Sequence, residues 1–506
     1  MQHQTSLNTP HPPCASNRSA ARPLRTVVHL ALLLALCSLV GVAGAAGGRV
    51  TVYPAPAGET LSQDYQVSVE GQTVPVYLAK VGPADEKRRW KAMDDKKNSA
   101  DFFDLASFAY FDLLGGPVQV TVTSPEPIAK ARILPNSLHL TPVIQGRTLS
   151  FTVAKPGNLT IEINGEIFRS LHLFANPPET DVPQQGDPNV IYFGPGVHEV
   201  SRLVVGDNQT VYIAGGAVVR AIIKPDETFH ISGYSGLRTY APSFELKGKN
   251  IKFRGRGIID QGGCTTHARH MLSIHGSDIT VEGVILRDAS TWTVPVRQSD
   301  RVTIKNIKLL GHRANSDGID ICNSRDVTVE DCFIRTLDDL IVIKADKGQG
   351  EVKSIIARRC VLWNQVAHAL SVGAELRENV DDVLFTDCDV IHDTGREWAL
   401  RVYHCDAATV SNVRFENLRI EEARHLISVW IGKAVWSRDR EAGHIRGVSF
   451  KDIQASSDPL RVELKGFDAA HGVADVSFKD VVVNGRPLAM TDVKTNAFVS
   501  RVTVAP

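Results

Sequence analysis

The sequence lacks several features that would define whole classes of protein. Its 506 residues carry 56 Lys and Arg against 56 Asp and Glu, so there is none of the basic excess that accompanies nucleic-acid binding. With 43% hydrophobic and 22% charged residues, the composition excludes wholesale disorder and collagen-like or coiled-coil rods. The six cysteines after residue 46 lack the paired C-x-x-C spacing of a metal site. We therefore expect no metal and no other cofactor.

The first 46 residues contain no acidic side chain. They place Arg18, Arg22 and Arg25 ahead of an apolar run, Leu30–Ala43, which small residues follow. This pattern is typical of a signal peptide, and the run is shorter than the roughly 20 apolar residues of a membrane span. An uncleaved anchor is the alternative. Cleavage leaves 53 basic and 56 acidic residues, so we expect a secreted or periplasmic monomer that contacts neither nucleic acid nor membrane.

A short pattern recurs along the C-terminal part of the chain. Its first, third and sixth positions are apolar and its fifth is usually Asn or Asp; copies begin at Ile279, Val302, Val327, Ile355, Val383, Val413, Val448 and Val476. A second series of strand-like segments interleaves with it, beginning at Met271, Val294, Gly318, Leu340, Leu370, Leu400 and Ile427. Two strand series in phase, without helical patterning between copies, predict a right-handed parallel β-helix.

Residues 47–176 have a different pattern. Short alternating runs are separated there by Gly, Pro and Asn turns, which predicts a small β-sandwich. A Pro-rich linker, 177–188, leads into the β-helix at 189–506. The predicted fold class is therefore all-β, a parallel β-helix preceded by a sandwich. The sandwich could bind carbohydrate, but we favour a cap on the open end of the β-helix.

Three cysteines occupy the same position of the repeat. Cys332, Cys360 and Cys388 are each 28 residues apart, so they should stack in one inward ladder with the strand spacing of about 4.8 Å. We expect buried thiols, because neighbours in register on parallel strands have poor geometry for a disulfide. Oxidation of one adjacent pair is the alternative.

Reactive side chains stand at nearly the same phase of four successive coils. Asp317, the pair Asp338 and Asp339, His368 and Arg401 each lie at or just before a strand of the second series. Each alone is ordinary in a turn or a strand, but stacking would bring them together, at a separation that could allow the roughly 6.5 to 9.5 Å between carboxyl groups of inverting glycosidases. Crowded carboxylates should raise at least one pKa, which supplies a protonated acid beside ionised bases.

The segments around these residues resemble the polygalacturonase family. NSDGIDI is similar to its N-T-D-G signature, TLDDLIVIK to G-D-D-C, AHALSVGAE to G-H-G-I-S-I-G, and LRVYHC stands where the family has R-I-K. The resemblance covers roughly residues 189–453. It implies that Asp338 is the general acid, that Asp317 and Asp339 activate water, that His368 tunes the acid and that Arg401 binds sugar.

The sequence also departs from that pattern. Leu337 and Leu340 replace the glycine and cysteine around the Asp pair, the glycines beside His368 are alanines, and Tyr403 replaces the lysine of R-I-K. Loss of that lysine weakens the case for a uronate substrate. The dextranase and isopullulanase family, which acts on neutral α-glucans, has a similar fold, carboxylate trio and N-terminal sandwich. It lacks the histidine that is retained here.

The predicted function is a secreted, inverting, metal-independent glycoside hydrolase of a pectic polysaccharide. Substrate-binding candidates beside Arg401 are Tyr403 and two tryptophans, Trp430 and Trp436. The rings of Tyr and Trp combine an apolar face with a polar group, and such rings commonly bind sugars. The alternatives are an α-glucan hydrolase and a non-catalytic β-helical carbohydrate-binding or adhesion protein. A polysaccharide lyase would need a Ca²⁺ cluster and an Arg or Lys base instead of three carboxylates.

Overall fold

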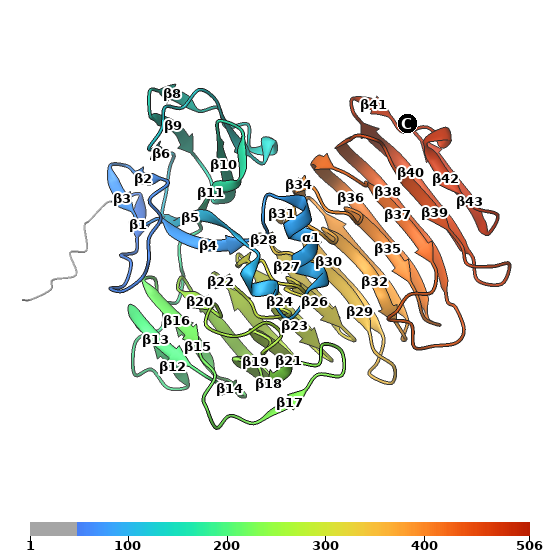
Figure 1. Ribbon diagram of the computed structural model, residues 1–506, viewed down its shortest axis with the longest axis horizontal. Coiled ribbons are helices and arrows are strands. Elements are labelled where there is room, and N and C mark those ends of the chain that lie inside the picture. Colours follow the sequence, from blue (N-terminus) through green and yellow to red (C-terminus); the bar gives the residue numbers. More distant parts are fainter. Residues whose placement is uncertain (1–47) are drawn as a thin grey trace, which may run out of the picture. The chain divides into compact units, whose positions relative to one another are not determined.

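The computed structural model describes residues 48–506, so the signal peptide predicted at 1–46 lies outside the described residues. The described part is nearly all β (Figure 1), with one α-helix, α1 (Glu86–Asp94). No helix in it is long and apolar enough to cross a membrane. The predicted fold class, a right-handed parallel β-helix after a β-sandwich, is confirmed.

The N-terminal domain contains two sheets, β1-β5-β11-β10-β7 with β4 paired to β5, and β3-β2-β6-β9-β8. Valine, leucine and phenylalanine side chains from both sheets fill the space between them. Its strands are β1 (Val50–Val52), β2 (Gln66–Val69), β3 (Gln72–Val74), β4 (Tyr77–Val81), β5 (Asp104–Leu113), β6 (Val118–Thr123), β7 (Ala131–Leu134), β8 (Val143–Gln145), β9 (Thr148–Val153), β10 (Gly157–Ile163) and β11 (Glu166–Asn176).

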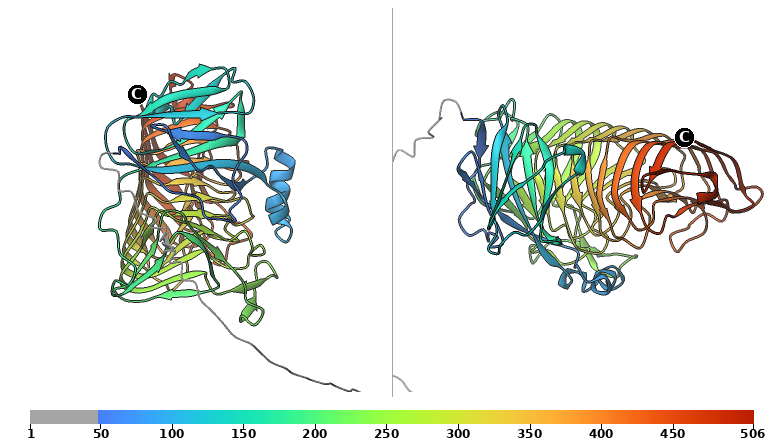
Figure 2. Two further views of the ribbon diagram at one scale, coloured as in Figure 1. Left: turned by 90° about the vertical axis from the view of Figure 1, so that its left-hand side faces the viewer. Right: turned by 90° about the horizontal axis from the view of Figure 1, so that it is seen from above.

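The β-helix is one 30-stranded sheet wound into stacked coils, which Figure 2 shows along and across the stack. Its strands pair in parallel as three ladders, apart from β41 (Arg486–Pro487), which pairs antiparallel with β40 (Val473–Val483). The site ladder, named for the residues described below, consists of β14 (Leu203–Val205), β19 (Phe244–Gly255), β21 (Leu272–Glu282), β23 (Val294–Arg297), β26 (Ile319–Cys322), β29 (Ile341–Ala345), β32 (Leu370–Leu376), β35 (Leu400–His404), β37 (Ile427–Ile431), β39 (Val462–Lys465) and β42 (Val493–Thr495).

The second ladder carries the six-residue repeat. With the later parts of β19 and β21 it consists of β12 (Val190–Phe193), β15 (Thr210–Ile213), β24 (Asp300–Lys305), β27 (Arg325–Glu330), β30 (Val352–Arg358), β33 (Val380–Thr386), β36 (Thr409–Ala423), β38 (His444–Ser457), β40 (Val473–Val483) and β43 (Val499–Ala505). First positions of the repeat pair in register, as Val302 does with Val327 and Val327 with Ile355. The fifth-position residues turn the chain in the left-handed conformation, which Asn and Asp tolerate; they include Asn306, Asp331, Asp387, Asn417, Asp452 and Asp480.

The third ladder faces the sandwich. It consists of β13 (Gly196–Val200), β16 (Ala217–Ala221), β20 (Ile258–Asp260), β22 (Ile285–Arg287), β25 (Lys308–Leu310), β28 (Phe333–Arg335), β31 (Val361–Asn364) and β34 (Asp389–Asp393). Between the second and third ladders Cys332, Cys360 and Cys388 are buried free thiols, as are the other three cysteines of the described chain.

The sandwich packs along the side of the β-helix and not over its open end, so the expected cap is wrong. The outer face of β4, β5 and β11 is apolar and aromatic, and it covers side chains of the third ladder from Val218 to Ile391. Buried polar groups anchor this interface. Arg256 donates to Asp112 at 2.7 Å, and Arg335 donates to the carbonyl of Phe168 at 2.8 Å.

A further buried ion pair joins the two parts across this interface. His392 of β34 lies 2.5 Å (Nε2 to Oε1) from Glu162 of β10, and its Nδ1 lies 2.6 Å from Glu422. His392 and Glu162 are both buried. Burial disfavours the imidazolium, but the hydrogen bonds to the two carboxylates outweigh burial and raise the pKa of His392.

We expect this pair to stabilise the fold most at acidic to neutral pH. Because the folded-state pKa is raised, the contribution is fully present below the unfolded pKa of about 6.5 and is lost as pH rises through the folded value. A double-mutant cycle of His392→Gln and Glu162→Gln, followed by denaturant unfolding, should give a coupling free energy of about 1.5 to 3 kcal/mol at the acidic end. A coupling energy that does not change up to pH 9 would contradict the pairing.

Candidate active site

Backbone hydrogen bonds between consecutive coils hold the predicted residues in one column. The amide of Thr293 donates to the carbonyl of Asp317 at 2.8 Å, Gly318 to Asp339 at 2.8 Å, and Leu340 to His368 at 2.9 Å. Each of these residues immediately precedes a strand of the site ladder or lies close to one. The parallel strand spacing therefore separates Asp317, Asp339 and His368 by about 4.8 Å per coil.

The glycine that follows Asp317 is required by this close stacking. A Cβ atom on Gly318 would lie 2.4 Å from the carbonyl oxygen of Leu340 and 2.8 Å from a methyl carbon of Ile334. Any larger residue would push apart the coils that carry Asp317 and the Asp338–Asp339 pair. This contact gives the physical reason for the glycine in the sequence NSDG.

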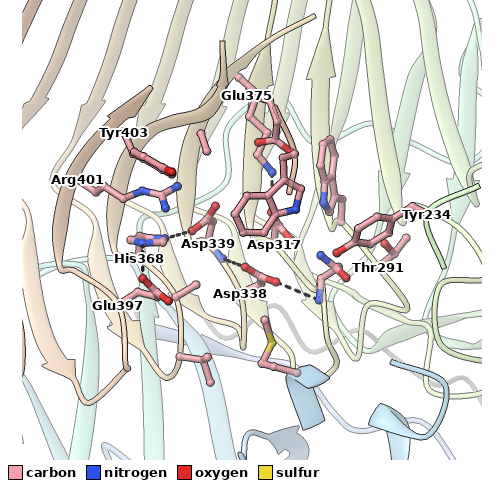
Figure 3. A pocket seen from close by; sticks show the side chains of 18 of the residues that line it. Tyr234, Thr291, Asp317, Asp338, Asp339, His368, Glu375, Glu397, Arg401 and Tyr403 are labelled. Atoms are coloured by element: carbon pink, nitrogen blue, oxygen red, sulfur yellow. Dashed lines mark hydrogen bonds and ion pairs between the residues drawn. The ribbon is translucent and has the colours of Figure 1, made fainter. Parts of the chain in front are cut away.

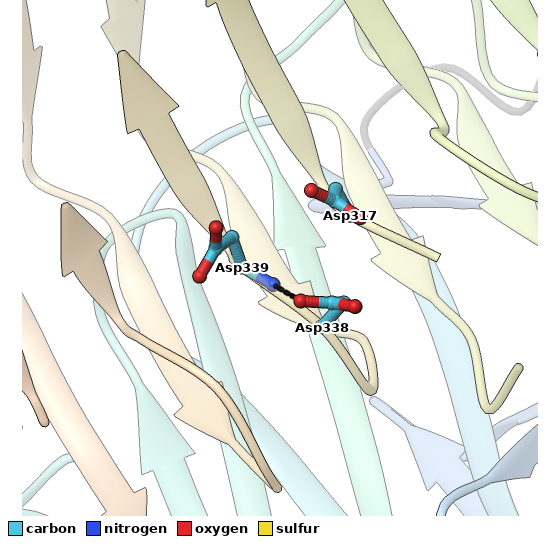
Figure 4. A group of neighbouring side chains, drawn as sticks. All are labelled: Asp317, Asp338 and Asp339. Atoms are coloured by element: carbon cyan, nitrogen blue, oxygen red, sulfur yellow. Dashed lines mark hydrogen bonds between the residues drawn. The ribbon is translucent and has the colours of Figure 1, made fainter. Parts of the chain in front are cut away.

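The three carboxyl groups converge in the cleft. One oxygen from each of Asp317, Asp338 and Asp339 lies within 4.8 Å of the others (Figure 4). This limit applies to single oxygens, and the carboxyl groups as wholes lie farther apart than their nearest oxygens, so it does not measure the group separation of roughly 6.5 to 9.5 Å that we took as typical of inverting glycosidases. Asp317 and Asp339 stand at the same phase of adjacent coils, so little beyond one coil spacing separates them. The separation alone therefore does not assign the stereochemistry.

Asp338 is the most accessible of the three carboxyl groups. It is half-buried, whereas Asp317 and Asp339 are buried. Its oxygens accept hydrogen bonds from the backbone amides of Asp339 at 3.0 Å and Asn315 at 3.2 Å. Burial and the adjacent charge of Asp339 raise the pKa of Asp338 to about 7. At mildly acidic pH the protonated group faces the cleft.

Asp339 is held in the opposite state. Its Oδ1 lies 2.5 Å from Nδ1 of His368. Burial opposes ionisation of Asp339, but His368, Arg401 and Lys344 outweigh it and hold the pKa of Asp339 well below its usual range. Burial and the Arg401 charge lower the pKa of His368. A neutral His368 that donates its Nδ1–H therefore keeps Asp339 ionised next to a protonated Asp338.

Lys344 is a member of the site that the sequence analysis missed. Its ammonium lies 3.0 Å from Asp317, 2.9 Å from Asp320 and 4.0 Å from the centre of the Trp292 ring. Burial disfavours this charge, but Asp317 and Asp320 outweigh burial and raise the pKa of Lys344 well above its usual value. Burial raises the pKa of Asp317, and Lys344 opposes that increase. Alternation along the strand could have identified Lys344 from the sequence. Ile341 and Ile343 point inward, so Lys344 points outward.

Arg401 lies on β35, one coil beyond His368, and is fixed by two acceptors. Its Nε donates to Ser371 Oγ at 3.0 Å and its Nη2 to the carbonyl of Gly373 at 3.1 Å. The guanidinium lies 5.5 Å from the centre of the Tyr403 ring, which is half-buried. Trp430 meets the edge of Tyr403, with 6.4 Å between the ring centres. Arg401 and Tyr403 therefore present a cation and an aromatic ring to the same region of the cleft.

All the predicted site residues line a single cleft of about 880 Å³ (Figure 3): Asp317, Asp338, Asp339, His368, Arg401, Tyr403, Trp430 and Trp436. Besides Lys344, the sequence analysis did not assign to the site Glu375 and Glu397, Trp292 and Trp398, or Tyr234 of the hairpin β17 (Phe229–Ile231) to β18 (Arg238–Tyr240). It also missed Met93, Asp94 and Lys96 of the N-terminal domain. Glu375 lies on β32, and Trp292, Glu397 and Trp398 lie just before β23 and β35, so the phase of the repeat could have marked them. The residues of the N-terminal domain and Tyr234 have no such signal, because they approach the cleft only through folding.

The carboxylate trio is the one group of potential metal ligands that residues 48–506 bring this close together. Lys344 and His368 already pair with Asp317 and Asp339 at 3.0 and 2.5 Å. These two side chains satisfy oxygens that a divalent cation would need. The donor set therefore favours proton transfer over metal binding.

The fold and the site together define the class of this protein: a parallel β-helix with a carboxylate-lined cleft. The model of glycosyl hydrolases family 28 matches residues 245–501, so the chain belongs to that family. A polygalacturonase of Chamaecyparis obtusa is 23% identical over 241 residues, 45% of each chain. An endo-polygalacturonase of Pectobacterium carotovorum is 26% identical over 215 residues, 40% of this chain and 50% of the relative. The chain thus spans about half the length of the curated relatives it matches.

A solved structure shows the same fold. The hyperthermoactive exopolygalacturonase from Thermotoga maritima superposes with a TM-score of 0.52 at 16% identity, over 62% of this chain and 84% of that one. The similarity supports the β-helix architecture independently of the repeat pattern.

We expect the Asp338 carboxyl to titrate near pH 7 while Asp339 remains ionised. The carboxyl C=O band of Asp338 should disappear as pH rises through about 7, because burial and the Asp339 charge raise its pKa. Difference infrared spectroscopy between pH 5 and pH 9 measures this band, and Asp338→Asn serves as the control that removes it. Complete ionisation of every aspartate by pH 5 would contradict the assignment.

Proposed function

We propose that the protein is a secreted glycoside hydrolase that cleaves a pectic polysaccharide with inversion at the anomeric carbon. The observation that carries the proposal is the convergence of three carboxyl groups in one cleft, where Asp338 is poised to be protonated and Asp339 to be ionised. Membership of glycosyl hydrolases family 28 supports the reaction class. The polygalacturonase relatives support a pectic substrate.

In this mechanism Asp338 donates its proton to the glycosidic oxygen. It is the most exposed carboxyl of the trio, and an acid with a pKa near 7 remains protonated at mildly acidic pH. Asp339, whose pKa is held low, deprotonates the attacking water, and Asp317, which lies against Lys344, orients it. Lys344 stabilises the carboxylate of Asp317, and the Nδ1–H of His368 stabilises that of Asp339.

The charge of the cleft supports an anionic chain. Seven cationic side chains line it, beside six carboxyl groups: Lys96, Arg297, Lys344, Arg377, Arg396, Arg401 and Arg438 against Asp94, Asp317, Asp338, Asp339, Glu375 and Glu397. Arginine forms bidentate hydrogen bonds with carboxylates. A polyuronate could therefore neutralise those cations that the cleft's own carboxylates do not pair.

A second candidate, a hydrolase of a neutral or mixed-backbone glycan, is favoured by the region around Arg401. Tyr403 stands there in place of a lysine, and its ring lies beside Trp430, which meets Trp398 edge-on at 5.4 Å. Such aromatic surfaces bind the apolar faces of sugars without requiring a charge. The two candidates share the catalytic residues and differ in this subsite.

Reducing-sugar release by the purified mature protein tests the proposed function. Galacturonan, rhamnogalacturonan, dextran and pullulan should be compared, and activity on a pectic substrate should survive EDTA. No absorbance of unsaturated uronate should develop, because hydrolysis leaves no double bond. Loss of activity in EDTA or growth of that absorbance would indicate a lyase, and no release from any substrate would favour a binding protein.

Replacement of the proposed acid should abolish catalysis while leaving the fold intact. Asp338→Asn should lower kcat by about 10²- to 10⁴-fold, because an amide cannot supply the proton that the leaving oxygen needs. Asp317→Asn and Asp339→Asn should also lower kcat, and the combined losses should be far from additive if the three serve one step. Kinetics beside circular dichroism and Tm check this. Near-normal turnover by Asp338→Asn would refute its role.

The first product released should have the inverted anomeric configuration. Inversion follows if Asp317 and Asp339 activate water directly and no glycosyl-enzyme bond forms. Proton NMR during the first turnovers, before mutarotation, distinguishes the anomers. The close packing of the carboxylates makes the test informative, since a retained configuration would identify one of them as a nucleophile.

Tyr403→Lys should separate the two substrate candidates. A charge-assisted hydrogen bond to a carboxylate contributes roughly 1.5 to 3 kcal/mol, or about 10- to 150-fold in affinity. If the subsite holds a uronate, the variant should raise kcat/KM on galacturonan. If it holds a neutral sugar, the unpaired ammonium should lower activity on that sugar. Unchanged kcat/KM on both galacturonan and dextran would show that Tyr403 does not contact substrate.

A further inference from the structure

One segment of the N-terminal domain leaves the sandwich and reaches the cleft. Residues 82–103 join β4 to β5 and carry α1 and the short helix η1 (Ser99–Asp101); we call this segment the α1 excursion. It is docked at its start by reciprocal bonds between Gly82 and the Gln365 side chain, at 3.1 and 3.0 Å. At its end the Ser99 hydroxyl accepts from the amide of Ala314 at 2.6 Å. Both contacts are made to loops that flank the carboxylate trio.

The docking explains one departure from the polygalacturonase pattern. Leu337, which stands where that family has glycine, is buried in a small apolar cluster with Ala92 of α1 and Val366. Leu337 immediately precedes Asp338. On the far side of α1, Asp94 lies 3.5 Å from Arg396, another residue of the cleft. The excursion is therefore attached on both sides of the catalytic residues.

The excursion meets the β-helix again across the cleft. The ammonium of Lys96 lies 3.5 Å from the centre of the Tyr234 ring, a cation–π contact. Tyr234 belongs to the β17–β18 hairpin, and its ring stacks on His267 with 6.1 Å between centres and 9° between planes. Lys96, Tyr234 and His267 all line the cleft, and Figure 3 shows Tyr234 on the side opposite Arg401. The Lys96–Tyr234 contact thus joins the α1 excursion to the β17–β18 hairpin, two segments that are distant in the sequence.

The position of this contact along the β-helix follows from the order of the coils. The β17–β18 hairpin precedes β19, and β21 and β23 lie between β19 and β26, the strand that follows Asp317. Three coil spacings of about 4.8 Å place the hairpin's coil roughly 14 Å before Asp317. In the other direction the cleft passes Arg401 and continues to Trp436, which is 39% exposed. The Lys96–Tyr234 contact therefore lies on the N-terminal side of the carboxylates, and Trp436 lies on the C-terminal side.

We propose that the Lys96–Tyr234 contact is an end wall of the substrate cleft, so that the enzyme accepts a chain end and releases short products. The inference rests on the proposed hydrolase function and adds its mode of action. The α1 excursion is then part of the substrate site, although it belongs to the N-terminal domain. A polysaccharide threads in from the Trp436 end and stops at the wall.

Product size and viscosity test the wall directly. Wild-type protein acting on galacturonan should release one short product from the first minutes, while the viscosity of the solution falls slowly for each reducing end formed. Tyr234→Ala and Lys96→Ala should shift the products to a mixture of longer chains and increase the viscosity lost for each reducing end. Lys97→Ala is the matched control, because Lys97 is exposed and is not part of the cleft lining. Each variant should keep the wild-type Tm.

The outcomes separate this inference from the function on which it rests. If wild type releases no reducing ends from any of the four polysaccharides, the proposed function fails. If wild type is active but lowers viscosity early with mixed products, the function stands and the wall is refuted. If both wall variants keep the wild-type product pattern at unchanged Tm, Lys96 and Tyr234 do not close the cleft. A Lys97→Ala variant that behaves like the wall variants would also overturn the assignment.

Discussion

The backbone hydrogen bond from one coil to the next is the constraint on which the site depends. It fixes Asp317, Asp339 and His368 in one column, since each residue's carbonyl accepts an amide from the preceding coil at 2.8 to 2.9 Å. Side chains at one phase of a parallel β-helix have no freedom to separate along the axis. Gly318 shows how strict this is, because a Cβ atom there would collide with Leu340. The close packing of the catalytic residues is therefore a consequence of the fold.

Four carboxyl groups, those of Asp317, Asp320, Asp338 and Asp339, lie close together, so their simultaneous ionisation is unfavourable. The position of the surrounding cations affects which of the four has the lowest pKa. Lys344 lies between Asp317 and Asp320, and His368 donates to Asp339. Among the described residues Asp338 accepts hydrogen bonds from two backbone amides, and burial and the Asp339 charge raise its pKa to about 7. Burial also raises the pKa of Asp317 and Asp320 against the opposing charge of Lys344, whereas the pKa of Asp339 is lowered. Groups of one chemical type thus acquire different protonation states from their partners. That division is what acid and base roles in one step require.

The N-terminal domain acts through two contacts of different kinds. Its apolar outer sheet covers the side of the β-helix, where buried pairs such as Arg256 with Asp112 and His392 with Glu162 satisfy polar groups that would otherwise be unpaired. The α1 excursion instead packs Ala92 on Leu337, next to Asp338. The polygalacturonase family has a glycine at this position. Leu337 replaces it here, where a segment of the N-terminal domain packs against the β-helix.

The sequence by itself determined the β-helix and the column of reactive residues. A periodic apolar pattern specifies stacked strands, and one phase of that period specifies which side chains meet. Lys344 was within reach of the same reasoning, through alternation along β29. Only the tertiary structure decided the close approach of the carboxylates, the lateral packing of the sandwich, and the placement of Lys96 beside Tyr234. These depend on contacts between segments with no common period, and a periodic pattern carries no information about such contacts.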